Sequence, residues 1–346
     1  MAQAAPAPPT SSMALIRLMS GLWISQLIYV IAKLGIPDLL REGPRSADEL
    51  AEKTGTHAPS LYRVLRALTT VGVLFEDERG NFYLTPLSLH LRSGVHGSLR
   101  SMAIMFGEPW HWDVWGSLLH SVRTGQPAFE HVHGMGTYEY VTEHLDVAAV
   151  YDSAMTSITR QTAAAIADGY DFDGVKTIVD IGGGHGTLLI DLLTAHPHLS
   201  GTVFDLPHVV EGAHPAIEAA GLADRLDAVG GDCFEHVPPG ADAYITKSFI
   251  HSFDDDRATA ILRTIREAMP PHGRVLVCEM VLPDDNEPHF GKLLDIEMLT
   301  QSADGRDRTH DQFRELFASA GLTLRKVHDT DSPVSVIEGI ANGAGR

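Results

Sequence analysis

The sequence predicts an α/β chain whose N-terminal half is mainly helical and whose C-terminal half is built on a parallel sheet. Residues 175–193 run from an apolar strand through a glycine-rich turn into a helix, which is the repeating unit of parallel sheets. Residues before 171 show helical spacing, interrupted by one hairpin pattern. A length of 346 residues also favours two domains over one.

Charge and cysteine content narrow the possible partners. The chain has 45 acidic and 26 basic residues, a net charge of −19, and residues 1–150 hold 11 of the basic and 14 of the acidic ones. Neither half has the positive field that nucleic-acid backbones require. Two cysteines, Cys233 and Cys278, are too few for a disulfide framework or a thiolate zinc cluster. We expect a cytoplasmic protein with no nucleic-acid partner.

The N-terminus combines a polar tail with a very apolar helix. Residues 1–12 are rich in Ala, Pro and Ser and are expected to form a disordered tail. In the helical stretch 13–36, the longest uncharged run covers 18–32, which is shorter than the ~20 residues that span a bilayer. Apolar side chains cover almost its whole circumference, so we expect a homodimer interface here and no membrane span.

The next segment has the element order of a winged helix. Ser46 and Glu49 form a capping-box pattern at the start of one helix. A second helix is expected over 58–68, followed by hairpin strands at 73–75 and 82–84. A helix–turn–helix followed by a hairpin predicts a winged-helix domain.

DNA binding is the commonest use of a winged helix, but the composition of this one argues against it. Its second helix offers Arg63 and Arg66 and is otherwise mostly apolar, whereas a recognition helix needs several base-reading and phosphate-reading side chains. We therefore expect residues 13–97 to form a dimerisation domain that also contributes to the substrate wall.

Residues 98–170 are expected to form a helical linker that lines the substrate site. They contain an unusual density of large apolar side chains, including Met105, Trp110 and Met155. Most of these will be ordinary core residues. Methionine and aromatic side chains also form adaptable walls for flat ligands, which makes these three candidate substrate contacts.

The glycine-rich turn has the pattern G-x-G-x-G. Its glycines are Gly182, Gly184 and Gly186, whereas the dinucleotide fingerprint would require glycine in place of Thr187. Asp205 follows a second strand and could accept hydrogen bonds from ribose hydroxyls.

A second acid strengthens this interpretation. Asp232 follows the strand candidate 226–229, where it could accept a hydrogen bond from an adenine amine. An adenosine ligand without a pyrophosphate fingerprint points to S-adenosylmethionine.

The remaining strands complete a Rossmann-like sheet. Candidates at 243–246 and 274–278 flank a helix, and 322–327 with 334–340 can pair in antiparallel fashion. Residues 171–346 are therefore expected to form a seven-stranded, methyltransferase-like, cofactor-binding catalytic domain.

Several motifs taken together resemble one family, the small-molecule O-methyltransferases. This family includes plant caffeic acid and isoflavone enzymes, animal hydroxyindole O-methyltransferase and bacterial antibiotic-tailoring enzymes. The motifs are Val179-Asp-Ile-Gly-Gly-Gly-His-Gly186, Phe204-Asp-Leu-Pro207, Gly231-Asp-Cys-Phe234, Lys247-Ser-Phe-Ile-His251 with Asp254-Asp255, Glu279, and Gly305-Arg-Asp-Arg-Thr309.

The resemblance implies roles for particular residues. His251 corresponds to the catalytic base, and Glu279 and Asp307 to the acids that orient it. Met298 and Met155 correspond to residues that clamp the acceptor ring, and Ser302 is placed in the same substrate site. The cofactor residues implied are Gly182, Gly184, Asp205, Leu206, Asp232, Cys233 and Lys247.

One departure concerns the catalytic segment. The family usually has His-Asp-Trp where this chain has His251-Ser252-Phe253, which affects how the acceptor is oriented and how the loop packs. The histidine pairs His131/His133 and His196/His198 lack the carboxylate or cysteine spacing of a metal site, so no metal is expected.

A histidine base suits methylation of a phenol. A phenol with a pKa of ~10 is mostly protonated at neutral pH, and an imidazole with a pKa of ~6.5 can accept its proton during transfer. The sequence therefore predicts a homodimeric O-methyltransferase acting on a small hydroxylated aromatic substrate, which we expect to be polycyclic. Two alternatives stay open: a relative that binds the cofactor but catalyses hydroxylation or decarboxylation-linked chemistry, and a winged-helix regulator that senses the cofactor.

Overall fold

The computed structural model describes residues 11–95, 97–302 and 304–342, in a chain that divides into two compact units. One unit comprises the residues up to Gly116 together with 140–158, and the other comprises 117–139 together with the residues from Thr159 onward. Residues 98–170 therefore contribute to both. Two helices cross the division, α11 (Thr137–Glu143) and α12 (Leu145–Gly169).

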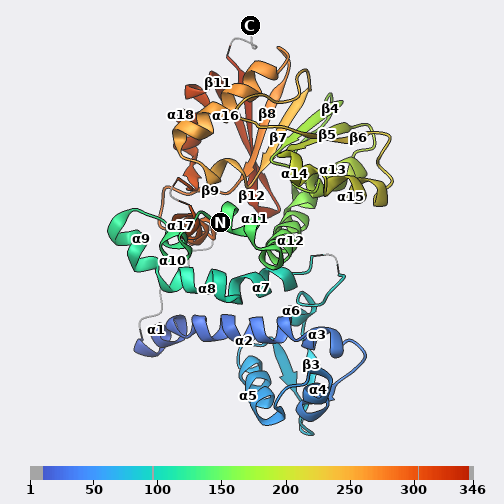
Figure 1. The fold of residues 1–346 in the computed structure, drawn as a ribbon, viewed down its shortest axis with the longest axis vertical. Coiled ribbons are helices and arrows are strands. Elements are labelled where there is room, and N and C mark those ends of the chain that lie inside the picture. Colours follow the sequence, from blue (N-terminus) through green and yellow to red (C-terminus); the bar gives the residue numbers. More distant parts are fainter. Residues whose placement is uncertain (1–10, 96, 303, 343–346) are drawn as a thin grey trace, which may run out of the picture. The chain divides into compact units, whose positions relative to one another are not determined.

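The first unit has the predicted winged-helix order, in which α4 and α5 precede the hairpin β2–β3 (Figure 1). The predicted capping box is present, since Ser46 and Glu49 each accept a hydrogen bond from the other's backbone. The elements are α1 (Ser12–Met19), α2 (Gly21–Lys33), α3 (Ile36–Leu39), β1 (Arg45–Ser46), α4 (Ala47–Thr54), α5 (Ala58–Thr69), β2 (Leu74–Glu76), β3 (Asn81–Leu84), α6 (Pro86–Leu89), α7 (Arg100–Gly107) and α8 (Pro109–Gly116).

The apolar N-terminal stretch forms two helices. Ser11 caps α1, so helix begins at the end of the segment predicted as a tail; residues 1–10 of that segment lie outside the described residues. Leu18 and Trp23 are 71% and 65% exposed. Within the described residues, the stretch 12–33 is long and apolar enough to cross a bilayer by length and composition. The structure divides it at Ser20 into helices of 8 and 13 residues, each shorter than the ~20 needed.

The second unit contains the predicted seven-stranded sheet, in the order β11-β12-β8-β7-β4-β5-β6. The five strands from β8 to β6 are parallel, and β12 pairs antiparallel with both β8 and β11. The strands are β4 (Thr177–Ile181), β5 (Ser200–Asp205), β6 (Leu226–Gly230), β7 (Ala243–Lys247), β8 (Arg274–Glu279), β11 (Leu322–Thr330) and β12 (Ser332–Ala341).

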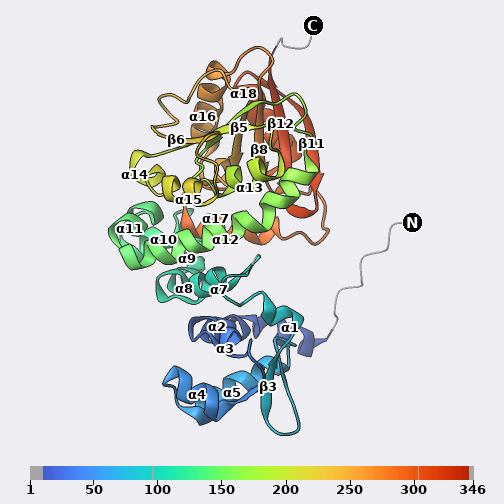
Figure 2. The same ribbon diagram turned by 90° about the vertical axis from the view of Figure 1, so that its right-hand side faces the viewer.

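Helices cover both faces of this sheet and bury two apolar cores. One core joins the sheet to α12, α13 and α15, and the other joins it to α16 and α18. Figure 2 shows these helices around the sheet. The other elements of the unit are α9 (Leu118–Thr124), α10 (Ala128–His133), α13 (Thr187–Ala195), α14 (Pro207–Val210), α15 (Ala213–Ala219), the 3₁₀ turn η1 (Ile250–Ser252), α16 (Asp255–Ala268), β9 (Val281–Leu282), α17 (Gly291–Gln301), β10 (Arg308–Thr309) and α18 (His310–Ser319).

The carboxyl ends of the parallel strands carry the polar residues that the sequence singled out. Strands β5, β7 and β8 end at Asp205, Lys247 and Glu279, and Asp232 follows β6. In open α/β sheets these ends meet at one edge, which is where ligands bind. The fold therefore gathers residues from separate motifs into one candidate site.

Candidate active site

The glycine-rich turn is shaped by close packing and by backbone conformation. Gly182 has φ +72°, and a Cβ placed there would lie 2.5 Å from Cδ2 of Phe249. Only glycine satisfies both constraints. Gly184 has φ +57° and its N–H donates to Oδ2 of Asp205 at 2.9 Å. The turn is thus fixed against the segment that carries His251 and against the end of β5.

The two predicted adenosine-binding acids are held by backbone N–H groups. Oδ1 of Asp205 accepts from the N–H of Leu206 at 2.7 Å, and Oδ1 of Asp232 accepts from the N–H of Phe234 at 2.9 Å. A carboxylate has about four acceptor positions, so both acids keep capacity for ligand hydroxyl or amine groups. The side chain of Leu206 is exposed beside them.

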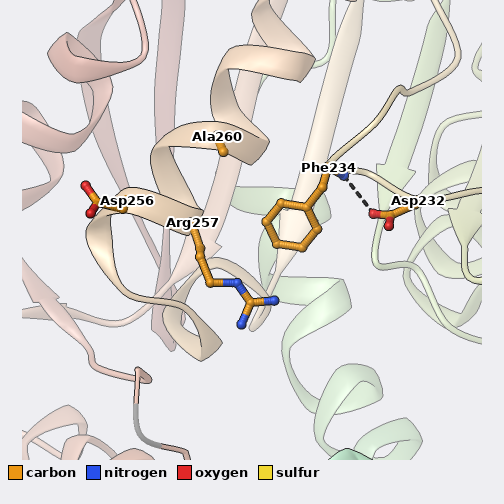
Figure 3. Close-up of a pocket in the computed structure, with 5 residues that line it drawn as sticks. All are labelled: Asp232, Phe234, Asp256, Arg257 and Ala260. Carbon is orange, nitrogen blue, oxygen red and sulfur yellow. Dashed lines mark hydrogen bonds between the residues drawn. The ribbon is translucent and has the colours of Figure 1, made fainter.

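A cavity of about 450 Å³ opens next to Asp232 (Figure 3). Figure 3 shows the ring of Phe234 directed toward the guanidinium of Arg257, which lies 5.0 Å from the centre of that ring and 4.8 Å from the centre of the Phe253 ring. Aromatic walls beside a carboxylate suit a flat heterocycle that bears an amine. Arg257 lies outside the motifs recognised in the sequence.

Asp180, in β4 below the turn, is a second residue near the site for which no motif predicted a role. Its side chain is 2% exposed, and Oδ2 has no hydrogen-bond partner among the described residues. A Cβ on Gly183 would lie 2.8 Å from this oxygen. Burial, and then the charge of Asp205, raise the pKa of Asp180 to about 8, although Lys247 opposes the rise.

An unpaired acid under the turn fits a positively charged ligand, because a cation would satisfy the carboxylate that burial otherwise penalises. S-Adenosylmethionine carries a sulfonium and an ammonium group, so the donor set fits this cofactor. The available sequence signal was an acid inside the apolar strand 177–181.

Lys247 and Cys233 occupy the same edge of the sheet. Burial lowers the pKa of Lys247, although Cys278, Asp180 and Glu279 act in the opposite direction and raise it. The Nζ of Lys247 donates to Oγ of Ser248 at 3.2 Å. Burial raises the pKa of the Cys233 thiol to about 12, helped by the charges of neighbouring acids. This thiol stays protonated, so it can contact a ligand but is a poor nucleophile.

His251 lies in the 3₁₀ turn η1 with its side chain almost fully buried. Its Nδ1 lies 3.1 Å from Oδ1 of Asp307, and no described residue forms a hydrogen bond with Nε2. Since the carboxylate accepts the Nδ1 proton, the hydrogen bond assigns the tautomer in which Nε2 is the free acceptor.

The two predicted orienting acids act at different atoms. Asp307 contacts the imidazole, whereas Oε1 of Glu279 accepts from the backbone N–H of His251 at 2.9 Å and from that of Phe249 at 3.3 Å. Glu279 therefore holds the backbone of the turn and not the ring. Between Lys247 and Phe249, Ser248 is the one non-glycine residue of the described chain with positive φ, at 48°, a strained conformation that often occurs at functional sites.

The pKa of His251 reflects opposing effects. Burial alone would lower it, but the hydrogen bond to Asp307 and the charges of Glu279 and Asp307 together outweigh burial and the charge of Lys247. The pKa therefore lies above its ordinary value of 6.5. The imidazole is a stronger base than a free histidine.

The predicted acceptor contacts fall into both units. Ser302 donates from Oγ to the carbonyl of Ser252 at 3.4 Å, and a Cβ on Gly305 would lie 3.2 Å from the carbonyl oxygen of His251 and 3.5 Å from Cβ of Met298. Met298 and Ser302 thus lie beside the catalytic turn. The other three candidates belong to the first unit, in which Met105 and Trp110 are buried and Met155 is half-buried.

Ser252 and Phe253, which stand where the family usually has Asp and Trp, each contact neighbouring side chains. The hydroxyl of Tyr138 donates to Oγ of Ser252 at 3.3 Å. The Phe253 ring packs edge-on against Phe234 and Phe249, with centroids 5.6 and 5.2 Å away. Local contacts therefore accommodate both residues, and the His251 turn keeps an aromatic neighbour.

Comparison with known proteins identifies the class. The O-methyltransferase domain matches residues 115–323 and the O-methyltransferase dimerisation domain matches residues 16–93. The chain is 44% identical over 332 residues to phenazine O-methyltransferase of Lysobacter antibioticus, covering 96% of each protein. The crystal structure of LaPhzM superposes with a TM-score of 0.90 at 43% identity, covering 95% of this chain and 99% of that one.

The chain belongs to the O-methyltransferase family, in which the methyl donor is S-adenosylmethionine. Within it, the chain is similar to enzymes that tailor bacterial secondary metabolites, and it is an enzyme of that kind. The same group of relatives includes aclacinomycin 10-hydroxylase of Streptomyces purpurascens, at 34% identity over 90% of this chain and 84% of that protein.

Replacement of Asp180 by Asn should change how stability depends on pH in the absence of ligand. Between the unfolded pKa near 3.8 and the folded value of about 8, the folded chain holds a proton that the unfolded chain releases, so this group reduces the free energy of unfolding as pH rises. The Asp180→Asn substitution removes this pH dependence. The effect on the free energy of unfolding amounts to a few kcal/mol across the window, because one pKa unit equals about 1.4 kcal/mol. Urea unfolding of the ligand-free protein from pH 5 to 9 measures this, with the exposed Asp227→Asn as control. Parallel profiles for the wild type and Asp180→Asn would contradict the assignment.

Proposed function

We propose that the chain transfers the methyl group of S-adenosylmethionine to a phenolic hydroxyl of a polycyclic aromatic metabolite, with His251 as general base. The observation that carries the proposal is the buried imidazole whose Nδ1 faces Asp307 at 3.1 Å and whose Nε2 is available. This is the arrangement that proton removal from an acceptor hydroxyl requires.

The residues of the chain perform two tasks in this reaction. When bound, the cofactor supplies an electrophilic methyl group on a positively charged sulfur. Asp205, Asp232 and the Asp180 carboxyl would hold it through its hydroxyl, amine and charged groups. His251 would accept the phenolic proton at Nε2 as the acceptor oxygen bonds to the methyl carbon and the carbon–sulfur bond breaks, leaving a neutral thioether, and Asp307 would stabilise the resulting imidazolium.

Support for a polycyclic acceptor comes from the relatives and from the side chains near the base. Phenazine O-methyltransferase, the 44% identical relative, is by its name an enzyme for a fused-ring aromatic. Met298 lies beside the His251 turn, and a flexible thioether packs well against aromatic faces. Positioning the ring against the methyl group is a large part of the catalytic effect.

The rival is non-methylating tailoring, because aclacinomycin 10-hydroxylase is among the relatives. The His251–Asp307 pair favours methyl transfer, because it supplies a base that can remove the proton of an acceptor phenol. Incubation with cofactor carrying an isotopic label in the methyl group separates the two, because only methyl transfer moves the label into the product.

Replacement of His251 by Ala should abolish most methyl transfer while leaving cofactor binding nearly unchanged. Loss of the general base typically costs about 10²- to 10⁴-fold in rate. Single-turnover rates with labelled cofactor and calorimetric cofactor affinity test this, with His272→Ala as control, since His272 pairs with Asp242 before β7 and is mostly exposed. Unchanged turnover in His251→Ala would remove this residue from the mechanism.

The pH dependence of the transfer rate should report the His251–Asp307 pair. Only the neutral imidazole accepts a proton, so the rate rises as pH passes through the pKa of His251, which lies above 6.5. Replacement of Asp307 by Asn removes a cause of that elevation, so the rising limb should move to lower pH and the plateau should fall.

Single-turnover rates between pH 5.5 and 9 measure that limb. Asp311→Asn, an exposed acid four residues further along the chain, is the matched control. A limb in Asp307→Asn that stays in place or moves to higher pH would contradict the pairing.

A homodimer is the third part of the proposal. The dimerisation domain match covers residues 16–93. Most of the exposed apolar side chains of α1 and α2 lie inside this range, including Leu18 and Trp23. Exposed apolar surface of this kind marks an interface.

Replacement of both Leu18 and Trp23 by Glu should convert the dimer to a monomer, because it places four charges on a symmetric dimer face. Sedimentation velocity in detergent-free buffer measures this, with Val122→Glu, a mostly exposed apolar position in α9, as control. A wild-type protein that is monomeric, or that pellets with phosphatidylcholine vesicles, would overturn the assignment of this face.

A further inference from the structure

Arg308 is the largest completely buried side chain of the described residues, at 0% exposed. It begins β10, directly after Asp307. A buried charge is costly unless it is paired and all of its donors are satisfied. The partners of this guanidinium therefore indicate what it holds in place.

The guanidinium joins one acid to the two carbonyl groups that flank the His251 turn, and its Nη1 also donates to the carbonyl of Arg306 at 3.5 Å. Nε and Nη2 donate to Oδ1 of Asp255 at 3.0 and 2.9 Å. Nη2 also donates to the carbonyl of Phe253 at 2.9 Å, and Nη1 donates to that of Ile250 at 3.4 Å. Ile250 and Phe253 flank His251, so this side chain spans η1 from its first residue to its C-cap.

Three consecutive residues of one segment contact this turn. The N–H of Arg306 donates to the carbonyl of His251 at 2.8 Å, Asp307 faces Nδ1 of the ring, and Arg308 holds the flanking carbonyls. The N–H of Asp307 is in turn fixed by Oδ1 of Asp295 at 3.0 Å. The ring and its acid are thus connected through the backbone as well as through their own hydrogen bond.

We propose that Arg308 is a positioning residue for methyl transfer, which clamps the His251 turn to the segment of Asp307 and thereby sets the ring–carboxylate contact and the direction of Nε2. The proposal rests on the proposed role of His251 as base. Arginine is required because a planar fork can donate to an acid and two carbonyls at once, whereas an ammonium group is a point donor on a flexible chain.

The neighbouring arginine provides a matched control. Arg306 pairs through its side chain with the other oxygen of the same Asp255, but that side chain is partly exposed and reaches neither flanking carbonyl. Arg306→Lys therefore perturbs the same acid without releasing the turn. The charged groups that influence the pKa of His251 are Asp307, Glu279 and Lys247, and none of them is altered in either variant.

The experiment compares Arg308→Lys with Arg306→Lys in the full-length protein. The readouts are the single-turnover rate, the KM values for both substrates and the pKa of His251, followed by NMR of ¹³Cε1-labelled histidine and assigned with His251→Gln. Arg308→Lys should lower the single-turnover rate about tenfold to a hundredfold, since a displacement of about 1 Å can cost a hundredfold. The KM for cofactor should stay within twofold, and the pKa of His251 should fall toward 6.5. Arg306→Lys should resemble the wild type.

A wild-type rate and pKa in Arg308→Lys would overturn the proposal. So would an equal loss of rate and cofactor affinity with an unchanged pKa, because that pattern describes general loosening of the fold. If Arg308→Lys does not fold by circular dichroism, Asp255→Asn carries the same comparison, since it weakens the anchor of the fork and leaves the arginine in place.

A double-mutant cycle locates the effect. In the Asp307→Asn background, the fold-decrease in single-turnover rate caused by Arg308→Lys should be less than one third of the decrease it causes in the wild type. The reason is that the contact positioned by Arg308 is already impaired in that background. Full additivity would contradict the clamp. The two proposals can fail separately. Retained activity in His251→Ala would reject His251 as the base, whereas the NMR measurement of the His251 pKa tests the Arg308 clamp without any need for turnover.

Discussion

The hydrogen bond between His251 and Asp307 is the interaction on which the candidate active site depends. It joins residues 56 positions apart at 3.1 Å, and both side chains are buried. Burial by itself favours a neutral imidazole and a neutral acid, so the contact works only if the geometry compensates for desolvation. Much of the surrounding structure supplies that compensation, with Glu279 on the backbone of the turn and Arg308 on its flanking carbonyls.

The cofactor edge follows a related rule. Asp205 ends β5 and Asp232 follows the neighbouring strand β6, and backbone N–H groups donate to both carboxylates and so orient them. Asp180 is the exception, because it is buried and unpaired and its pKa is raised to about 8. A site that carries such a group is less stable when empty, and a cationic ligand offsets part of that cost on binding.

Where the family has His-Asp-Trp, this chain has His251-Ser252-Phe253, and neighbouring side chains contact both replaced residues. Ser252 accepts a hydrogen bond from Tyr138, and Phe253 joins a cluster with Phe234 and Phe249 that Arg257 faces. Since Phe249 also packs on Gly182, the same aromatic cluster connects the cofactor turn to the catalytic turn. The glycine-rich turn and the His251 turn are therefore connected by direct side-chain packing within this unit.

The sequence by itself determined the elements and the chemistry that each strand end carries. Apolar periodicity, the capping box at Ser46 and the glycine spacing at 182–186 are local properties, so they predicted the winged helix, the seven strands and the edge of the sheet that holds the site. Only the tertiary structure decided which acid meets the imidazole. That Asp307 faces the ring, that Glu279 holds the backbone, and that Asp180, Arg257 and Arg308 lie near the predicted site residues all depend on contacts between distant segments. Burial and pairing of charge are set by packing that no local pattern encodes.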